Sequence, residues 1–130
     1  MFINVSNHPS CKWDVEQINE ATHYGEIIDL EFPVIPAEAD EDRIGCMAAD
    51  FYEKIMDLLD HKKESSSNGI RDAVMLQGEF TFTFALVNKL KDKGITVLSA
   101  CSDRKVVEKP DDNNNRIKEV RFQFVRFRRY

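Results

Sequence analysis

Two short apolar runs enclose a longer amphipathic segment in the second half of the chain. Residues 73–76 and 95–98 show no alternation of polar and apolar side chains, which is typical of strands covered on both faces of a parallel sheet. Between them, residues 80–93 carry apolar side chains at helical spacing and end at Gly94, with lysines in the last turns, as helices commonly do. The pattern predicts a strand, a helix and a second parallel strand joined by a right-handed crossover.

A competing interpretation comes from the alternation of Phe and Thr over residues 80–84. A period of two favours a strand and would make residues 77–79 a hairpin turn. The segment from Phe80 to Lys93 is fourteen residues long, which exceeds an ordinary strand and favours the helix. Its expected apolar stripe is Phe80, Phe84, Val87 and Leu90. Gly78 then lies where a strand ends and a helix begins, so the free N–H groups of the first helical turn would face outward and favour an anion.

The first half of the chain repeats this order of elements. The patterns predict a strand at 2–6, a helix at about 13–24, a strand at 26–32, and a helix from the acidic residues 37–42 to about His61, followed by a polar linker at 62–69. Numbered along the chain, the strands should form a doubly wound sheet in the order 2-1-3-4, with a switch point between the first and third strands.

The last part of the chain has a strand pattern with one irregularity. Residues 118–127 alternate apolar and polar side chains, but the phase slips at Val125, which predicts a β-bulge there. Residues 105–108 favour another strand and 110–115 a turn, so the two strands should form a hairpin added to the sheet. We therefore expect one α/β domain over residues 1–130, a Rossmann-like three-layer sandwich with a mostly parallel sheet and a C-terminal β-hairpin.

The composition bears on the localisation of the protein and on whether it holds a metal or cofactor. The chain has no apolar run of the roughly 18–20 residues that span a bilayer, and its first residues lack a basic leader segment. We expect a cytoplasmic protein without a membrane partner. The three cysteines are too widely spaced to predict a disulfide or zinc framework. No carboxylate cluster suggests a metal site, so we expect neither a metal nor a cofactor.

The net charge of −5 is unevenly distributed. Residues 116–130 carry six Arg or Lys and one Glu, whereas the remaining residues carry 12 basic and 22 acidic side chains. Duplex nucleic acid is therefore an unfavourable partner, because binding it needs a broad basic face. A compact anionic ligand, held by backbone donors and a few arginines, remains compatible with this charge.

Polar residues gather where the carboxyl ends of the central strands should meet. In an open α/β sheet, ligands bind beyond these ends at the switch point. Three stretches converge there: residues 6–10, 77–81 and 99–104. The candidate ligand-binding residues are Ser6, Asn7, Gln77, Gly78, Glu79, Thr81, Ser99, Ser102 and Asp103. This mixture of hydroxyls, amides and charges suits a phosphorylated or nucleotide ligand, although the glycine-rich phosphate-binding motifs are absent.

His8 and Arg104 are the candidate catalytic residues. An imidazole transfers protons near neutral pH, and a guanidinium stabilises phosphate charge. Each has a structural alternative, since His8 can simply lie in a solvent-exposed loop and Arg104 can pair with Asp103 or Glu79. Phe122, Phe124 and Phe127 are better explained as core or interface residues than as stacking platforms.

Two stretches carry a resemblance to a known family. The segments FINVSNHPS, followed by Trp13 and YGEIIDLEFP, and VMLQGEFTFTFALVNKLKDKGITVLSACSDR resemble the small stand-alone proteins of type III CRISPR loci. These proteins are related to the CRISPR-associated Rossmann fold (CARF) sensors. The order of strand, Gln-Gly-acidic residue, helix, strand and Ser-x-Arg is similar to that of ring nucleases, which bind and degrade cyclic oligoadenylate.

The resemblance implies a function and a partner. It implies a homodimer that binds cyclic oligoadenylate, with cyclic tetraadenylate as the expected ligand, across a two-fold axis. Cleavage in that class needs no metal, because a ribose 2′-hydroxyl attacks the adjacent phosphodiester, and it switches off type III antiviral signalling. The family has no uniform catalytic set to carry over, so the roles rest on local chemistry: His8 would transfer the proton and Arg104 would stabilise charge. The alternatives are a sensor or sequestering module that does not cleave the ligand, and a protein-interaction subunit of a defence complex.

Overall fold

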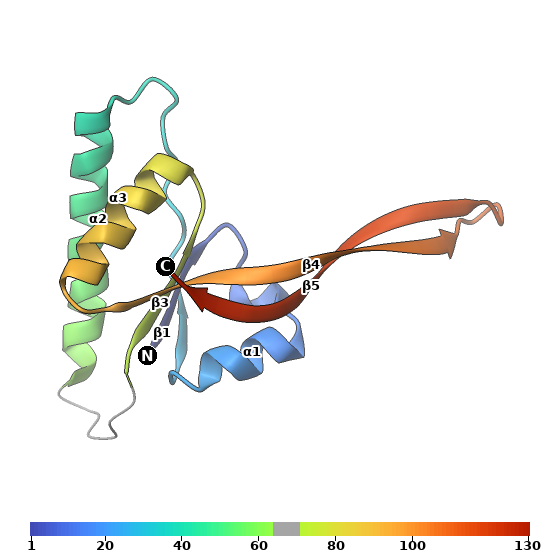
Figure 1. Ribbon diagram of the computed structural model, residues 1–130, viewed down its shortest axis with the longest axis horizontal. Coiled ribbons are helices and arrows are strands. Elements are labelled where there is room, and N and C mark those ends of the chain that lie inside the picture. Colours follow the sequence, from blue (N-terminus) through green and yellow to red (C-terminus); the bar gives the residue numbers. More distant parts are fainter. Residues whose placement is uncertain (64–70) are drawn as a thin grey trace.

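The computed structural model describes residues 1–63 and 71–130 and shows an α/β fold built on a five-stranded sheet (Figure 1). The elements are β1 (Phe2–Ser6), the 3₁₀ helix η1 (Ser10–Lys12), α1 (Val15–Thr22), β2 (Ile27–Asp29), α2 (Glu41–Lys63), β3 (Ala73–Gln77), α3 (Phe80–Asp92), β4 (Thr96–Pro110) and β5 (Arg116–Arg129). The strand order β2-β1-β3-β4-β5 confirms the predicted 2-1-3-4 sheet with an added C-terminal strand pair. The predicted linker at 62–69 lies outside the described residues from residue 64 onward.

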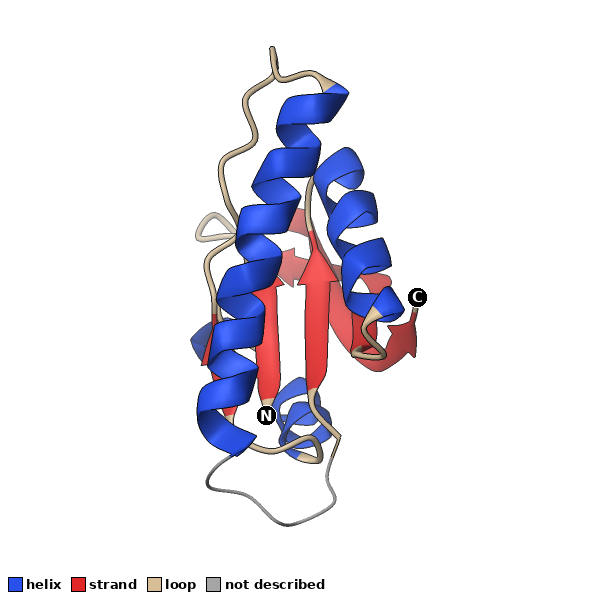
Figure 2. Ribbon diagram, turned by 90° about the vertical axis from the view of Figure 1, so that its left-hand side faces the viewer, coloured by secondary structure: helices blue, strands red, loops and turns tan. Residues whose placement is uncertain are grey.

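The helices cover both faces of the sheet. Helices α2 and α3 lie side by side on one face, and α1 lies on the other (Figures 1 and 2). The larger core lies under α2 and α3 and includes Val74, Ile55 and Leu86, each fully buried. A smaller cluster on the α1 face contains Phe2, Ala21 and Leu98. In the part of the chain that the structure describes, no helix is both long and apolar enough to cross a membrane.

The segment after Gly78 is a helix, as predicted, and Val87 and Leu90 of the expected stripe are buried, but its first turns bury other side chains than expected. Phe82 and Leu86 are fully buried, whereas Phe80 and Phe84 are 88% and 71% exposed. The ring of Phe82 makes edge contacts with Phe32 and Phe51, at centroid distances of 5.3 and 5.6 Å. An alternating Phe-Thr-Phe-Thr-Phe sequence offers two helical stripes, and these aromatic partners select the one that contains Phe82.

Strand β2 is shorter than the predicted strand at 26–32. Its pairing with β1 ends at Asp29, and the last backbone bond to β1 comes from the Leu30 amide. Phe32 then leaves the sheet and packs over Gly78, where a Cβ atom would lie 2.3 Å from the Phe32 ring. Gly78 is therefore needed for this close approach between a side chain and the backbone.

Strands β4 and β5 are much longer than predicted and form a projecting hairpin. Residues 99–104, beyond the predicted end of the strand at 95–98, continue β4, because β5 pairs with them along their whole length. The predicted bulge is confirmed: Cys101 pairs with Arg126 and Ser102 with Phe124, so Val125 is the extra residue. Beyond the bulge, the hairpin continues over residues 102–124; its root, with Ser102 and Phe124, lies against the body, and its distal part projects away from the rest of the protein (Figure 1). We call residues 102–124 the arm.

Replacement of Gly78 tests the packing that ends β3. We expect Gly78→Ala to lower the free energy of unfolding by about 1–3 kcal/mol, because the new methyl group overlaps the Phe32 ring. The control is Gly45→Ala in α2, where a Cβ atom meets nothing within 4 Å. This change should stabilise the protein by about 0.5–1 kcal/mol, since Gly is a poor helix former. Urea unfolding measures both values, and a neutral Gly78→Ala variant would contradict the packing argument.

Candidate functional site

A groove of about 670 Å³ lies at the carboxyl ends of β1 and β3, between the η1–α1 segment and the root of the arm. Strand β1 has β2 on one side and β3 on the other, so this is the switch point of the sheet. The lining residues are Ser6, His8, Lys12, Trp13, Asp14, Gln17, Met75, Gln77, Ala100, Ser102, Phe122 and Phe124. Four of the sequence-predicted residues therefore come together here: Ser6, His8, Gln77 and Ser102.

The loop that carries His8 is held by a hydrogen-bond network. The buried Asn4 amide donates to the His8 carbonyl at 2.9 Å and to the Asp29 carboxylate at 2.7 Å. The Ser6 hydroxyl donates to the Asn4 side chain at 2.8 Å and accepts from the His8 amide at 3.1 Å. Asp29 also accepts from the Ser10 hydroxyl at 2.8 Å. The backbone around His8 is thus rigid, and the hydroxyl of Ser6 is already used inside the protein.

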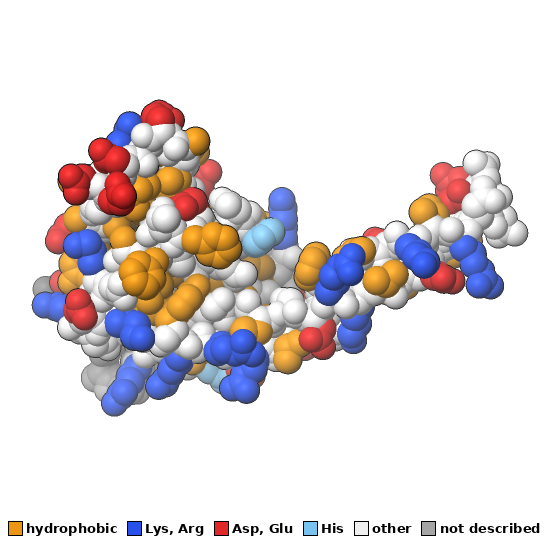
Figure 3. All heavy atoms as spheres, turned by 45° about the horizontal axis from the view of Figure 1, so that its top comes forward, with side chains coloured by type: hydrophobic (Ala, Val, Ile, Leu, Met, Phe, Trp, Pro, Cys, Tyr) orange, Lys and Arg blue, Asp and Glu red, His pale blue; other side chains and the backbone are white. Residues whose placement is uncertain are grey.

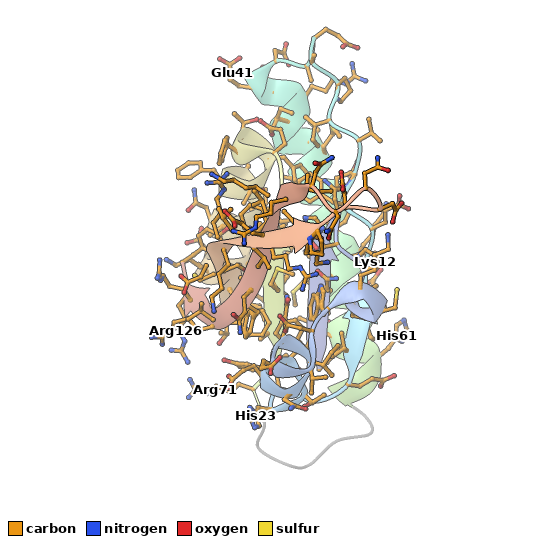
Figure 4. All side chains as sticks on the ribbon, turned by 90° about the vertical axis from the view of Figure 1, so that its right-hand side faces the viewer. Lys12, His23, Glu41, His61, Arg71 and Arg126 are labelled. Carbon is orange, nitrogen blue, oxygen red and sulfur yellow. The ribbon has the colours of Figure 1, made fainter. Side chains whose placement is uncertain are left out.

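The side chains of His8 and Lys12 project from this rigid loop without internal partners. Both are exposed, and neither makes a side-chain hydrogen bond or ion pair with another described residue. The Trp13 indole N–H donates to the His8 carbonyl at 3.0 Å, which also fixes the start of α1. Lys12 and His23 lie at opposite ends of the η1–α1 segment (Figure 4). The groove therefore offers one imidazole and one ammonium group to a ligand.

Asp14 joins α1 to the arm. One oxygen of its carboxylate accepts the Gln17 amide at 2.8 Å and so caps the helix. The other oxygen accepts the Phe124 amide at 3.3 Å, next to the bulge in β5. The carboxylate thereby holds the arm root against α1 and closes one side of the groove. A bulge leaves a backbone N–H group without a partner in the sheet. The sequence does not reveal which side chain accepts its hydrogen bond.

The N-terminus of α3 is capped by the chain itself. The Glu79 carboxylate accepts from the Phe82 amide at 2.8 Å, from the Thr81 amide at 3.1 Å and from the Thr81 hydroxyl. These bonds, the Phe82 amide first, lower the pKa of Glu79 below its ordinary value of 4.5. The amides expected to face an anionic ligand are therefore not bare. Gly78, Glu79 and Thr81 also lie outside the lining of the groove.

The other predicted site residues are dispersed. Asn7 lines a separate hollow of about 350 Å³ beside Asp29 and Glu31. Alternation along β4 places Ser99 and Asp103 on the face opposite to Ser102, away from the groove. Arg104 shares the face of Ser102 but lies farther out on the arm, opposite Phe122. Arg104 is thus on the approach to the groove and not among its lining residues.

Sequence reasoning missed several lining residues. The sequence predicts a helix that begins at about Trp13 and assigns no role to Lys12, whereas both residues line the groove at the η1–α1 segment. Phe122 is 70% exposed and lies beside the groove because β5 pairs with β4 and contacts α1 through Phe124. The position of Phe122 beside the groove follows from the pairing of β4 with β5, which is not visible in the sequence. Within residues 1–63 and 71–130, no group of three or more His, Cys, Asp or Glu is arranged to hold a metal ion.

A comparison with known families gives one match. A model described as "Uncharacterized protein MJ1673 family" matches residues 1–128. Neither the curated proteins nor the solved structures contain a significant match to the chain.

The Glu79 cap makes stability depend on pH. Because the folded-state pKa of Glu79 is lowered from 4.5, the cap contributes fully above this value and is lost as pH falls through the folded-state pKa. We expect Glu79→Gln to cost about 1 kcal/mol near neutral pH and less at acidic pH, as the carboxylate is protonated, as measured by urea unfolding. The control Glu16→Gln, in the first turn of α1, should have a smaller effect. Equal losses for Glu79→Gln at both pH values would contradict the cap.

Asp14 should hold the arm as well as the helix. Asp14→Ala and Asp40→Ala each remove a helix cap, since Asp40 accepts the Arg43 amide at 2.9 Å at the start of α2. Both should cost about 1 kcal/mol. Only Asp14→Ala should speed hydrogen exchange at the Phe124 amide and its neighbours in the arm, because only Asp14 binds that amide. Unchanged exchange in Asp14→Ala would show that the arm root is held by other contacts.

Proposed function

The chain belongs to the MJ1673 family, and from the groove we propose that it is a ring nuclease that binds cyclic oligoadenylate and cleaves it without a metal ion. One observation carries the proposal. At the switch point of the sheet, a rigid loop presents the unpartnered side chains of His8 and Lys12 beside the exposed ring of Phe122. An imidazole, a cation and an aromatic face are what proton transfer, phosphate binding and base stacking need.

The size of the groove supports a nucleotide ligand. Its volume of about 670 Å³ lies within the range of about 300–1,000 Å³ found for small-molecule sites. A ring of four nucleotides is larger than one such site can enclose. Two grooves related by a two-fold axis would share a ring that is itself nearly two-fold symmetric. The ligand that the sequence resemblance implies, cyclic tetraadenylate, therefore fits a dimer better than a single chain.

The arm supplies the recognition groups for bases and phosphates. Stacking on an aromatic ring contributes about 1–3 kcal/mol per base, and Phe122 presents its ring beside the groove. Among the described residues that line the groove, Lys12 is the one cationic side chain. Arg104 is paired with Phe122 on the same face of the arm, so a phosphate bound near Phe122 would meet its guanidinium. The Asp14 carboxylate, which also lines the groove, already accepts hydrogen bonds from the Gln17 and Phe124 amides.

The proposed cleavage is a transesterification that needs no metal ion. A ribose 2′-hydroxyl attacks the adjacent phosphorus, the P–O5′ bond breaks, and a 2′,3′-cyclic phosphate and a 5′-hydroxyl form. His8 would accept the proton of the 2′-hydroxyl, and the leaving 5′-oxygen would take its proton from water. Lys12 and Arg104 would stabilise the charge that develops on the phosphoryl oxygens. Loss of the cyclic messenger would switch off the antiviral response that depends on it.

A second candidate is a module that sequesters the same ligand intact. The observation that favours it is the acid–base content of the groove: His8 is its one imidazole among the described lining residues, and its carboxylate, Asp14, already accepts two backbone amides. No second lining group is placed to protonate a leaving oxygen. The two candidates differ in the fate of the bound nucleotide.

His8 separates cleavage from binding. We expect His8→Ala to slow cleavage of cyclic tetraadenylate by about 10²–10⁴-fold, the usual contribution of a general base, and to change affinity only slightly. The matched control is His23→Ala, an exposed histidine at the other end of α1, which should behave as wild type. Chromatography of the reaction measures cleavage, and calorimetric titration measures affinity.

Three outcomes are distinct. Equal cleavage rates for His8→Ala and wild type would remove His8 from the mechanism. Tight binding of a nucleotide that stays intact would favour the sequestering module. A wild-type protein that neither binds nor cleaves cyclic oligoadenylate would contradict the proposed function altogether.

A further inference from the structure

The face of β4 and β5 opposite the groove is only partly covered. Val97 packs into the core under α3, and alternation along β4 puts Ser99 and Cys101 on the same face. Arg128 and Arg126 lie directly opposite these two residues and therefore share that face. Ser99 and Cys101 are half-buried, and both arginines are exposed. Helix α3 thus covers the start of this face and leaves the rest open.

Three exposed aromatic rings border the open face. Phe80, Phe84 and Lys91 are four and seven residues apart, so they lie on one side of α3. The Lys91 ammonium donates to the Tyr130 carbonyl at 3.0 Å, which shows that this side of α3 faces the end of β5. The Tyr130 side chain lies on the face of Arg128, and its hydroxyl is held by the Leu76 carbonyl of β3 at 2.8 Å. The exposed fractions of Phe80, Phe84 and Tyr130 are 88%, 71% and 45%.

The two guanidinium groups beside these rings have no internal use. Neither Arg126 nor Arg128 makes a side-chain hydrogen bond or ion pair with another residue that the structure describes. We define the aromatic patch as Phe80, Phe84, Tyr130, Arg126 and Arg128. Figure 3 shows hydrophobic side chains gathered on the body of the protein with Lys and Arg side chains close by.

The charge around the aromatic patch favours an anionic ligand. Residues 80–101 and 125–130, which form α3 and the strand segments beside it, contain six Lys or Arg and one Asp. Farther out on the same face of β4, Asp103 and Lys105 carry one charge of each sign. Figure 2 shows α3 between α2 and the C-terminus, so the acidic side chains of α2 lie beyond α3.

The spacing of the rings and arginines suits a single-stranded nucleic acid. Phe80 and Phe84 are about 6 Å apart along the helix axis, and Arg126 and Arg128 are about 6.7 Å apart along β5. A single strand presents one base and one phosphate with each nucleotide. Neighbouring bases can therefore stack on the rings while the phosphates pair with the arginines.

Two other kinds of partner fit the aromatic patch less well. Extended peptides bind through free backbone groups at a sheet edge, whereas the backbone groups between β4 and β5 pair with each other across this face. A second copy of the chain, bound patch to patch about a two-fold axis, would place the same arginines against each other.

We propose that the aromatic patch binds a short stretch of single-stranded RNA or DNA, by base stacking and by arginine–phosphate contacts. Stacking and backbone contacts need neither a 2′-hydroxyl nor a particular base. A duplex does not fit, because its bases are already stacked on one another. The groove lies on the opposite face of β4 and β5, so this site is separate from it and does not depend on cyclic oligoadenylate.

Two phenylalanines on opposite faces give the sharpest test. Fluorescence anisotropy measures the binding of labelled oligouridylate and oligodeoxythymidylate of about ten nucleotides. Phe84 of the aromatic patch and Phe122 of the groove are equally exposed, at 71% and 70%. We expect Phe84→Ala to weaken the binding of both strands by about fivefold or more, because a stacked base is lost. Phe122→Ala should bind them as wild type does.

The arginines give a second test. Two phosphate contacts predict that the logarithm of the affinity falls with the logarithm of the salt concentration with a slope of about −1.4. Arg128→Glu should weaken binding and make this slope shallower. The matched control is Arg129→Glu, since Arg129 is exposed but pairs with Leu98 on the other face. Arg129→Glu should have a much smaller effect.

Other results overturn the proposal. These are no binding of either strand at high micromolar protein, equal binding of a duplex of the same length, and binding of polyglutamate in place of the oligonucleotides. Weakening by Phe122→Ala and not by Phe84→Ala would assign linear strands to the groove. Binding of RNA alone or DNA alone would support the site and identify its ligand. Circular dichroism confirms that the variants are folded.

The aromatic patch and the groove can fail independently. Cyclic tetraadenylate that is cleaved by a protein without affinity for either linear strand would contradict the patch and leave the proposed function standing. Binding of linear strands that depends on Phe84, in a protein that ignores cyclic tetraadenylate, would support the patch and contradict the proposed function.

Discussion

The departure of β4 from β3 is the constraint on which the rest of the structure depends. The two strands pair over only three residue positions, from Ala73 with Thr96 to Met75 with Leu98. Beyond them β5 supplies the pairing of β4, and the Tyr130 hydroxyl donates to the Leu76 carbonyl at 2.8 Å, beyond the last β3–β4 pair. The carboxyl edge of the sheet is therefore left open for a groove, and the hairpin that forms one wall continues outward as the arm.

The parallel core could be predicted because its signals are local. Apolar runs, the glycine after the third helix and the phase slip at Val125 each depend on neighbouring residues. The extent of β4 could not be predicted in this way. Residues 99–104 are mostly polar and continue the strand because β5 pairs with them, from Ser99 with Arg128 to Arg104 with Phe122, partners that are distant in the sequence. The buried stripe of α3 was equally non-local, since Phe32 and Phe51 select Phe82 over Phe80.

The site was predictable in position but not in composition. The switch-point rule brings Ser6, His8, Gln77 and Ser102 together. The same reasoning expected an external anion at the start of α3, where the protein uses the carboxylate of Glu79 instead. The preference of a helix N-terminus for negative charge does not say whether a ligand or the chain supplies it.

Amide chemical shifts during titration with cyclic tetraadenylate test the central claim most directly, namely that the groove at the open edge of the sheet is the nucleotide site. The account predicts saturable changes at residues 6–12, at Gln77 and Ser102, and around Phe122, which surround the groove. Changes confined to the start of α3, or a spectrum that stays unchanged at high nucleotide concentration, would contradict it.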